Sequence, residues 1–135
     1  MAGAELAGLT RWRFRDITVF GVNGEATLTG FVSTFREFLL DPTPRVLWDM
    51  RECSLSSIAH GKFRWLISQL MRSDLQKRPC GRSAFLCPED ADYDMARVLI
   101  AYAEANDYGI ELAVFRDIDE ARRWLFDDPP NDRSG

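Results

Sequence analysis

Four charged residues follow predicted strands, at positions where α/β proteins often bind ligands. Asp49 and Arg51 follow a short apolar run that is typical of a buried parallel strand, and Arg116 and Asp117 follow another. Open α/β sheets usually hold ligands at the carboxyl ends of their parallel strands. These four residues are therefore a candidate site for a polar ligand or a partner's side chain. The alternative, which we favour, is that they pair with one another and cap helices.

Residues suited to catalysis are sparse. The chain has one histidine, His60, and three cysteines, none of them at metal-ligand spacing. It has neither a Walker A loop nor a Gly-x-Gly-x-x-Gly turn. Cys53 and His60 flank one turn, but a part-buried cysteine and a surface histidine are the simpler interpretation. We expect no enzyme activity, no catalytic residue, no cofactor and no metal.

The helix expected from the serines at 54–57 to about residue 75 carries an aromatic side chain off its apolar face. At helical spacing Trp65 projects about 200° away from Phe63, beside an aliphatic residue and cations. Such a surface is a candidate docking patch for an acidic protein or an anionic membrane surface. Its residues are Ile58, Lys62, Trp65 and Arg72. The alternative is that Trp65 is covered by a loop or exposed on its own.

Composition narrows the class of protein. The chain has 135 residues, of which 46% are hydrophobic and 28% charged, values typical of one globular domain. Its net charge of −4 argues against a nucleic-acid partner. No apolar run approaches the roughly 20 residues of a transmembrane segment, and residues 1–9 lack the pattern of a secretory signal. We therefore expect a cytoplasmic protein with reduced cysteines.

Strand and helix patterns alternate along the chain. An N-terminal β-hairpin precedes helices that begin near Thr27, Ser54, Asp90 and Asp117, and apolar runs between these helices are typical of buried strands. This order predicts a single α/β domain over residues 10–126. Its sheet is expected to be mostly parallel and four- to five-stranded, with an antiparallel N-terminal hairpin strand and about four flanking helices. Residues 1–9 and 127–135 are expected to be flexible termini.

Arginine and aromatic residues alternate in the first strand of that hairpin. Arg11, Arg13 and Arg15 flank Trp12 and Phe14. A nucleic-acid-binding stripe is one interpretation. We favour the other, in which the arginines lie on the solvent face of an edge strand and deter edge-to-edge aggregation.

Four segments carry a resemblance to a known family: Gly-Glu-Ala-Thr at 24–27, Leu-Asp-Pro at 40–42, and residues 46–51 and 114–125. Together with the order of elements they resemble the SpoIIAA-like proteins of the STAS superfamily, some of which carry a combined STAS/CRAL-TRIO label. The resemblance covers roughly residues 10–126. It implies a regulatory domain that acts by binding a protein partner, and the CRAL-TRIO association implies a small apolar or lipid ligand.

The serine turn of that family differs here. STAS anti-sigma antagonists are switched by phosphorylation of a serine at the start of the second helix, typically in an Asp-Ser-Ser-Gly turn. This chain instead has Ser-Leu-Ser-Ser-Ile-Ala-His-Gly at 54–61. The resemblance makes Ser56 and Ser57 candidate phosphosites. We expect them to act as helix N-caps instead.

Two functions follow as expectations. The first is a non-enzymatic cytoplasmic regulatory or protein-interaction module. The alternative is a carrier or sensor of a small apolar or lipid ligand, with contact to a membrane surface. In the alternative, a pocket between helices and sheet would be lined by aromatic rings, whereas ordinary core packing would bury the same rings; they are Phe31, Phe35, Phe38 and Phe63.

Overall fold

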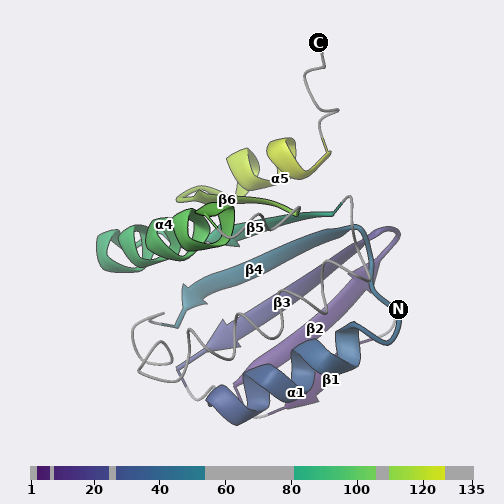
Figure 1. The fold of residues 1–135 in the computed structure, drawn as a ribbon. Coiled ribbons are helices and arrows are strands. Elements are labelled where there is room, and N and C mark those ends of the chain that lie inside the picture. Colours follow the sequence, from purple (N-terminus) through teal and green to yellow (C-terminus); the bar gives the residue numbers. More distant parts are fainter. Residues whose placement is uncertain (1–2, 7, 25–26, 54–80, 106–109, 127–135) are drawn as a thin grey trace.

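Six strands form one mixed sheet in which their order in space follows their order in the sequence (Figure 1). The first two pairings are antiparallel and the remaining three are parallel. The strands are β1 (Gly3–Leu6), β2 (Leu9–Phe14), β3 (Ile17–Asn23), β4 (Arg45–Glu52), β5 (Arg82–Leu86) and β6 (Glu111–Phe115). The computed structural model describes residues 3–6, 8–24, 27–53, 81–105 and 110–126.

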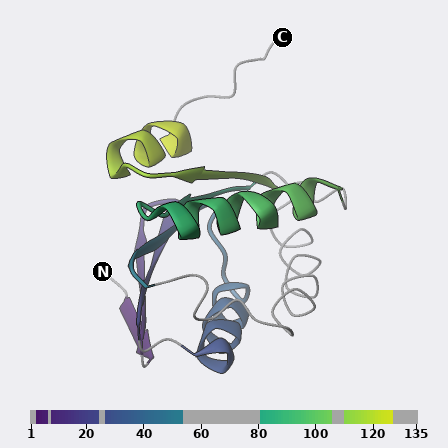
Figure 2. The same cartoon turned by 90° about the vertical axis from the view of Figure 1, so that its left-hand side faces the viewer.

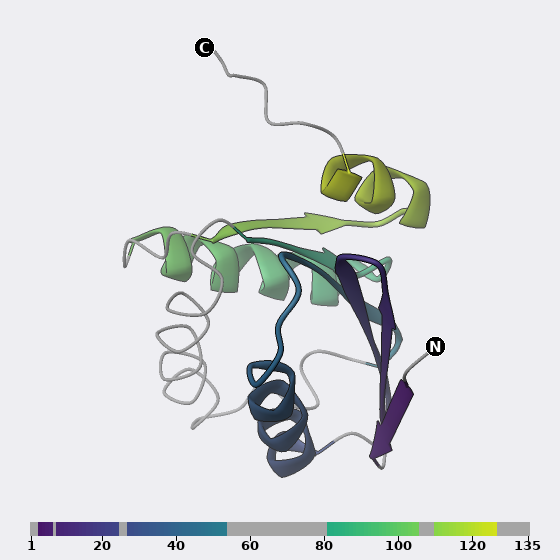
Figure 3. The same cartoon turned by 90° about the vertical axis from the view of Figure 1, so that its right-hand side faces the viewer.

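The described helices lie on both sides of this sheet. They are α1 (Leu28–Phe38), α4 (Asp90–Ala105) and α5 (Ile118–Phe126). α1 connects β3 to β4 and α4 connects β5 to β6, and successive right-handed crossovers in one direction place both helices on the same face. α5 follows the last strand and lies on the opposite face (Figures 2 and 3). We refer to these as the α1–α4 face and the α5 face.

The N-terminal part of the sheet is larger than the sequence predicted. The expected hairpin is confirmed as β2 and β3, which pair from Leu9↔Val22 to Phe14↔Ile17. The prediction that residues 1–9 are a flexible terminus is wrong for residues 3–6, which form β1 and pair with β2. The sheet therefore has six strands rather than four or five, and the edge strand is β1, not β2.

The core of the α1–α4 face is a stack of aromatic rings. The Trp48 ring lies 4.2 Å from Phe20 and 5.0 Å from Phe31, centroid to centroid, in stacked geometry. Phe35 and Phe38 are buried and contact Phe20 in turn. Three of the phenylalanines considered as the lining of a ligand pocket are thus core residues. The fourth, at position 63, lies outside the described residues.

α1 begins and ends for local reasons. The Thr27 hydroxyl accepts a hydrogen bond from the Gly30 N–H at 3.0 Å, which satisfies one free donor of the first turn. Phe31, Phe35 and Phe38 recur at helical spacing and are all buried. The helix ends before Pro42, because the residue preceding a proline is displaced from helical backbone angles.

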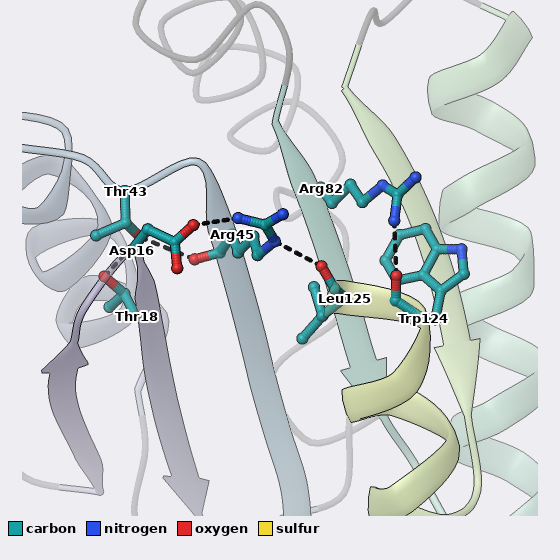
Figure 4. Close-up of polar contacts among 7 residues, drawn as sticks. All are labelled: Asp16, Thr18, Thr43, Arg45, Arg82, Trp124 and Leu125. Carbon is teal, nitrogen blue, oxygen red and sulfur yellow. Dashed lines mark hydrogen bonds and ion pairs between the residues drawn. The ribbon is translucent and has the colours of Figure 1, made fainter. Parts of the chain in front are cut away.

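Two arginines hold the last turn of α5 against the sheet (Figure 4). Arg45 Nε donates to the Leu125 carbonyl at 2.6 Å, and an Arg82 terminal nitrogen donates to the Trp124 carbonyl at 2.7 Å. The carbonyls of a last helical turn have no partner within the helix and carry partial negative charge, so cations stabilise them. Arg45 and Arg82 are register partners on β4 and β5, which fixes α5 over this end of the sheet.

Carboxylates and hydroxyls complete this network (Figure 4). Asp16, in the turn between β2 and β3, pairs with Arg45, and Glu111 pairs with Arg82 at 2.7 Å. Beside them, the buried hydroxyls of Thr18 and Thr43 are hydrogen-bonded at 2.8 Å. α5 is therefore positioned by polar contacts at its end as well as by its buried side chains.

The coarse prediction of an α/β fold with a mainly parallel sheet is confirmed. The second of the four expected helices, over residues 54–75, falls outside the described residues, and so does the predicted C-terminal tail, 127–135. None of the helices in the described ranges is long and apolar enough to span a membrane.

Candidate functional site

Asp49 and Arg51 pair with each other at the end of β4. Arg51 donates two hydrogen bonds to the two carboxylate oxygens, at 3.0 and 2.7 Å, and its backbone N–H donates a third, at 3.1 Å. Partial burial alone would raise the pKa of Asp49, but these hydrogen bonds and the positive charge of Arg51 lower that pKa below its ordinary value. The Asp49 carboxylate is therefore ionised and fixed in place by Arg51.

Arg116 and Asp117 are engaged in local contacts at the end of β6. Arg116 donates to the Pro88 carbonyl at 3.2 Å and to Asp90 at 2.5 Å, and its guanidinium lies 4.2 Å from the centroid of the Tyr93 ring. The Asp117 carboxylate accepts the Glu120 N–H at 3.1 Å and so caps α5.

The four predicted residues do not form one site. β5 lies between β4 and β6, so the two pairs are separated by two strand spacings, or about 10 Å. The geometry shows the alternative stated for them: Asp49 pairs with Arg51, and Asp117 caps a helix. The candidate docking residues Ile58, Lys62, Trp65 and Arg72 and the candidate phosphosites Ser56 and Ser57 all lie outside the described residues.

The two arginines of β2 lie on the side of the sheet that carries α1. Register places Arg11 beside Phe20 and Arg13 beside Thr18, both on the α1–α4 face. There Arg11 pairs with Glu37 of α1 at 2.8 Å, and Arg13 pairs with Asp41 just after α1 at 2.6 Å. The predicted solvent exposure is therefore wrong for Arg11, whose side chain is 22% exposed, whereas the Arg13 side chain stays 42% exposed beside its acidic partner.

The aromatic residues of β2 are exposed on the other face. Trp12 is 44% exposed and Phe14 is 61% exposed. They lie on the α5 face, where α5 packs on β4, β5 and β6 and its hydrophobic cluster reaches Ile17 and Val19 of β3. Neither Trp12 nor Phe14 belongs to that cluster. Together with the half-buried Val19, the register partner of Trp12, they form a surface that we call the open patch.

A small cavity adjoins the open patch. It has a volume of about 220 Å³ and is lined by Thr10, Gly21, Val22, Asn23, Asp49 and Glu52. We call it the acidic pocket, because its charged lining is two carboxylates. Thr10 is two residues from Trp12 on the same face of β2, so the open patch and the acidic pocket are adjacent.

Gly21 leaves this pocket open. A Cβ atom at position 21 would lie 2.5 Å from the Thr10 hydroxyl oxygen, closer than side chains tolerate. The pairing of β3 with β4 is also irregular here: Gly21 pairs with Asp49 and Asn23 with Glu52, so β4 has one residue more than β3 between the two pairs, as in a β-bulge. Bulges bend a strand end and redirect its side chains, and they occur often at binding sites.

The described residues contain little that suits catalysis. They include no cluster of three or more His, Cys, Asp or Glu side chains arranged to hold a metal ion. Cys53 and Cys87 are both buried, and neither forms a disulfide. Burial, with a further contribution from the charges of Asp92 and Asp49, raises the pKa of the Cys87 thiol to about 12, so it is a poor nucleophile at neutral pH.

Comparison of this chain with protein-family models, curated proteins and solved structures finds no match. The candidate site therefore stands on its own geometry. Its main elements, Trp12 and Phe14, were visible in the sequence as an alternating strand, but the strand's orientation was not, because both of its faces carry large side chains.

Proposed function

We propose that this protein is a non-enzymatic regulatory protein-interaction module that binds a partner through the open patch. The observation that carries the proposal is the exposure of Trp12 and Phe14, side by side on β2 and outside the hydrophobic cluster of α5. Tryptophan and other aromatic residues dominate the binding energy of protein interfaces. A role without chemistry also agrees with the SpoIIAA-like resemblance, which implies partner binding.

The acidic pocket favours a particular kind of contact. At about 220 Å³ it is smaller than the roughly 300–1,000 Å³ sites of drug-sized ligands. A cavity of this size fits one side chain of a partner rather than a metabolite. Asp49 is already paired with Arg51, so Glu52 is the carboxylate of the lining that a partner's lysine or arginine side chain would meet. Trp12 lies next to it and can take the apolar part of the same partner segment.

The carrier function receives less support. Its expected pocket would need free space beside Phe31, Phe35 and Phe38, and those rings are buried among Phe20 and Trp48 instead. The interaction module is therefore the better proposal, with a cytoplasmic protein as the expected partner.

The experiment compares two double variants in capture from native lysate. Trp12→Ser/Phe14→Ser removes the open patch, and Leu40→Ser/Val98→Ser removes two exposed apolar residues elsewhere, which are 83% and 53% exposed in the wild type. We expect recovery of specific partners to fall about tenfold in the first variant, equivalent to ~1.4 kcal/mol of binding, and to stay unchanged in the second. Equal recovery by both variants would refute the proposal.

Photo-crosslinking locates the contact directly. A benzophenone amino acid is placed at position 14 in one sample and at position 98 in another. We expect partner adducts from position 14 only. Adducts from position 98 alone would show that binding uses the α1–α4 side of the molecule.

A further inference from the structure

A second and larger cavity lies at the opposite edge of the sheet from β1. Its volume is about 520 Å³. β6 forms its floor, α4 contributes Tyr93 on one side, and α5 contributes Glu120, Arg123 and Trp124 on the other. The remaining lining residues are Val114, Phe115 and Arg116 of the β6 end. We call this cavity the edge slot, since it lies at the end of the last strand between residues of α4 and α5. These two helices flank β6 on its two faces (Figure 2).

In the described part of the chain, β6 pairs with β5 on one side and has no partner strand on the other. The Glu111 N–H donates to the Gly81 carbonyl, and the Phe115 carbonyl accepts from the Cys87 N–H, so both residues direct their backbone groups toward β5. In a strand these directions alternate from residue to residue. Leu112 and Val114 therefore direct their N–H and C=O groups away from the sheet, into the position that a seventh strand would occupy.

The walls of the slot provide aromatic rings and three charged side chains, those of Arg116, Glu120 and Arg123. The Phe115 and Trp124 rings contact each other at 5.6 Å, centroid to centroid, on the α5 side. Arg116 lies over Tyr93 on the α4 side, where Asp90 holds it. Arg123 is exposed and forms no ion pair with any residue in the described part of the chain. A carboxylate beside Arg123 would gain a partner there.

We propose that the edge slot binds an extended peptide segment of a partner protein, which pairs with β6 as an additional strand and carries an acidic side chain toward Arg123. The edge of β6 provides main-chain hydrogen bonds to the added strand. The residues on either side of β6 contact alternate side chains of that strand and select among them. On the α5 side the segment meets Trp124 and Arg123, and on the α4 side it meets Tyr93. This site is separate from the open patch and goes beyond the proposed function.

Geometry favours a peptide over a small ligand. A small molecule in the slot would leave the outward N–H and C=O groups of Val114 to water, whereas an extended chain satisfies them in the ordinary pattern of a parallel or antiparallel ladder. Exposed edges are also where sheets accept further strands.

The experiment selects short random-sequence peptides from a display library on the full-length protein. Binding of the enriched peptides is then measured by fluorescence anisotropy against variants. Val114→Pro removes the outward N–H but no bond to β5, and proline is tolerated on an edge strand in this orientation. Val114→Thr is the matched control, since it keeps both the N–H and the β-branched shape. Arg123→Glu reverses the charge of the exposed wall.

We expect enriched peptides to share an acidic residue within an extended apolar segment. Their affinity should fall about tenfold or more in Val114→Pro and in Arg123→Glu, and stay unchanged in Val114→Thr. Thermal melting of each variant checks the fold, and Arg123→Glu tests the slot even where the proline variant unfolds. Binding that survives Arg123→Glu, or an enriched set without acidic residues, would overturn the proposal.

The two proposals fail separately. Trp12→Ser/Phe14→Ser is predicted to leave peptide binding at the edge slot unchanged. Peptides that lose affinity in that variant and not in Val114→Pro would place extended-segment binding on the open patch and exclude the edge slot. Dimerisation of the wild type that Val114→Pro abolishes would identify a second copy of this chain as the occupant, and would equally overturn the proposal.

Discussion

Cys87 is a buried thiol whose ionisation opposes the fold. Burial, together with the charges of Asp92 and Asp49, raises its pKa from 9.0 to about 12 in the folded protein. A thiol with a raised pKa keeps its proton in the folded state after the unfolded chain has lost it. Its contribution to stability is therefore complete below pH 9.0 and decreases as the pH rises from there toward 12.

We predict a pH-dependent difference between the wild type and Cys87→Ala. From pH 8 to pH 10 the wild type should lose about 1.4 kcal/mol more free energy of unfolding than the variant, since one pKa unit corresponds to that energy. Urea unfolding at several pH values measures the difference. Any constant cost of the smaller side chain cancels in this comparison. Parallel stability profiles for the two proteins would contradict the assignment.

At the same scale, sequence reasoning found residue types but not their partners. Asp49, Arg51 and Arg116 were correctly singled out as charges at strand ends, and each one has a local partner that satisfies it. The orientation of Trp12 was missed. A strand that alternates arginine with aromatic residues has no clearly apolar face, and the choice was made by Glu37 and Asp41, acidic residues at α1 that are distant in sequence.

At the scale of single elements, α5 depends on contacts at its C-terminal end. Ala121 and Leu125 are its buried residues, so a short helix is held by few apolar contacts. Hydrogen bonds from charged groups contribute about 1.5–3 kcal/mol each, more than neutral ones. The bonds from Arg45 and Arg82 to the Leu125 and Trp124 carbonyls are therefore a large part of what keeps α5 on the sheet.

We predict that Arg45→Met and Arg82→Met each destabilise the protein by about 1–3 kcal/mol, since methionine keeps the apolar length of the side chain but not its donors. Amide hydrogen exchange should accelerate in α5 before other helices. The control is Arg13→Met, which breaks the exposed pair with Asp41 and should cost less than about 1 kcal/mol. Unchanged exchange in α5 would show that its buried side chains suffice.

Elements with strong periodicity were predictable and β1 was not. α1 combines an N-cap, phenylalanines at helical spacing and a proline stop, so local signals agree along its whole length. The residues of β1, Gly-Ala-Glu-Leu, have low strand propensity. The strand exists because a tight turn at Gly8, with φ of 77°, returns the chain along β2. That tertiary pairing leaves no mark in the pattern of residues 3–6.

At the scale of the whole molecule, the sequential order of the strands places the open patch and the edge slot in different parts of the sheet. α5 covers the sheet from β4 to β6 and packs with Ile17 and Val19 of β3, which leaves Trp12 and Phe14 of β2 exposed and the edge slot beyond β6. The two surfaces lie on either side of α5. Because the two described crossover helices, α1 and α4, lie on the other face, neither of them stands between a partner and the open patch (Figure 3).

β1 protects that open part of the sheet from self-association. It pairs with β2 over four register positions, from Gly3↔Trp12 to Leu6↔Leu9. Without it, β2 would present a free edge directly beside Trp12 and Phe14. A free edge next to exposed aromatic side chains is the combination that natural proteins avoid, since it pairs readily with another chain.

We therefore predict that deletion of residues 1–6 produces oligomers whose size increases with protein concentration. Analytical ultracentrifugation measures these oligomers. The far-ultraviolet circular dichroism spectrum of the truncated protein should stay that of the wild type. β1 is an edge strand that pairs with β2, so the sheet from β2 to β6 keeps its own strand pairings and should still fold. Adding Trp12→Lys to the truncated chain should restore the monomer, because a charge on an edge strand opposes edge-to-edge pairing. A truncated chain that stays monomeric at high concentration would show that the β2 edge is already protected by its own arginines, Arg11 and Arg13, through their pairs with Glu37 and Asp41.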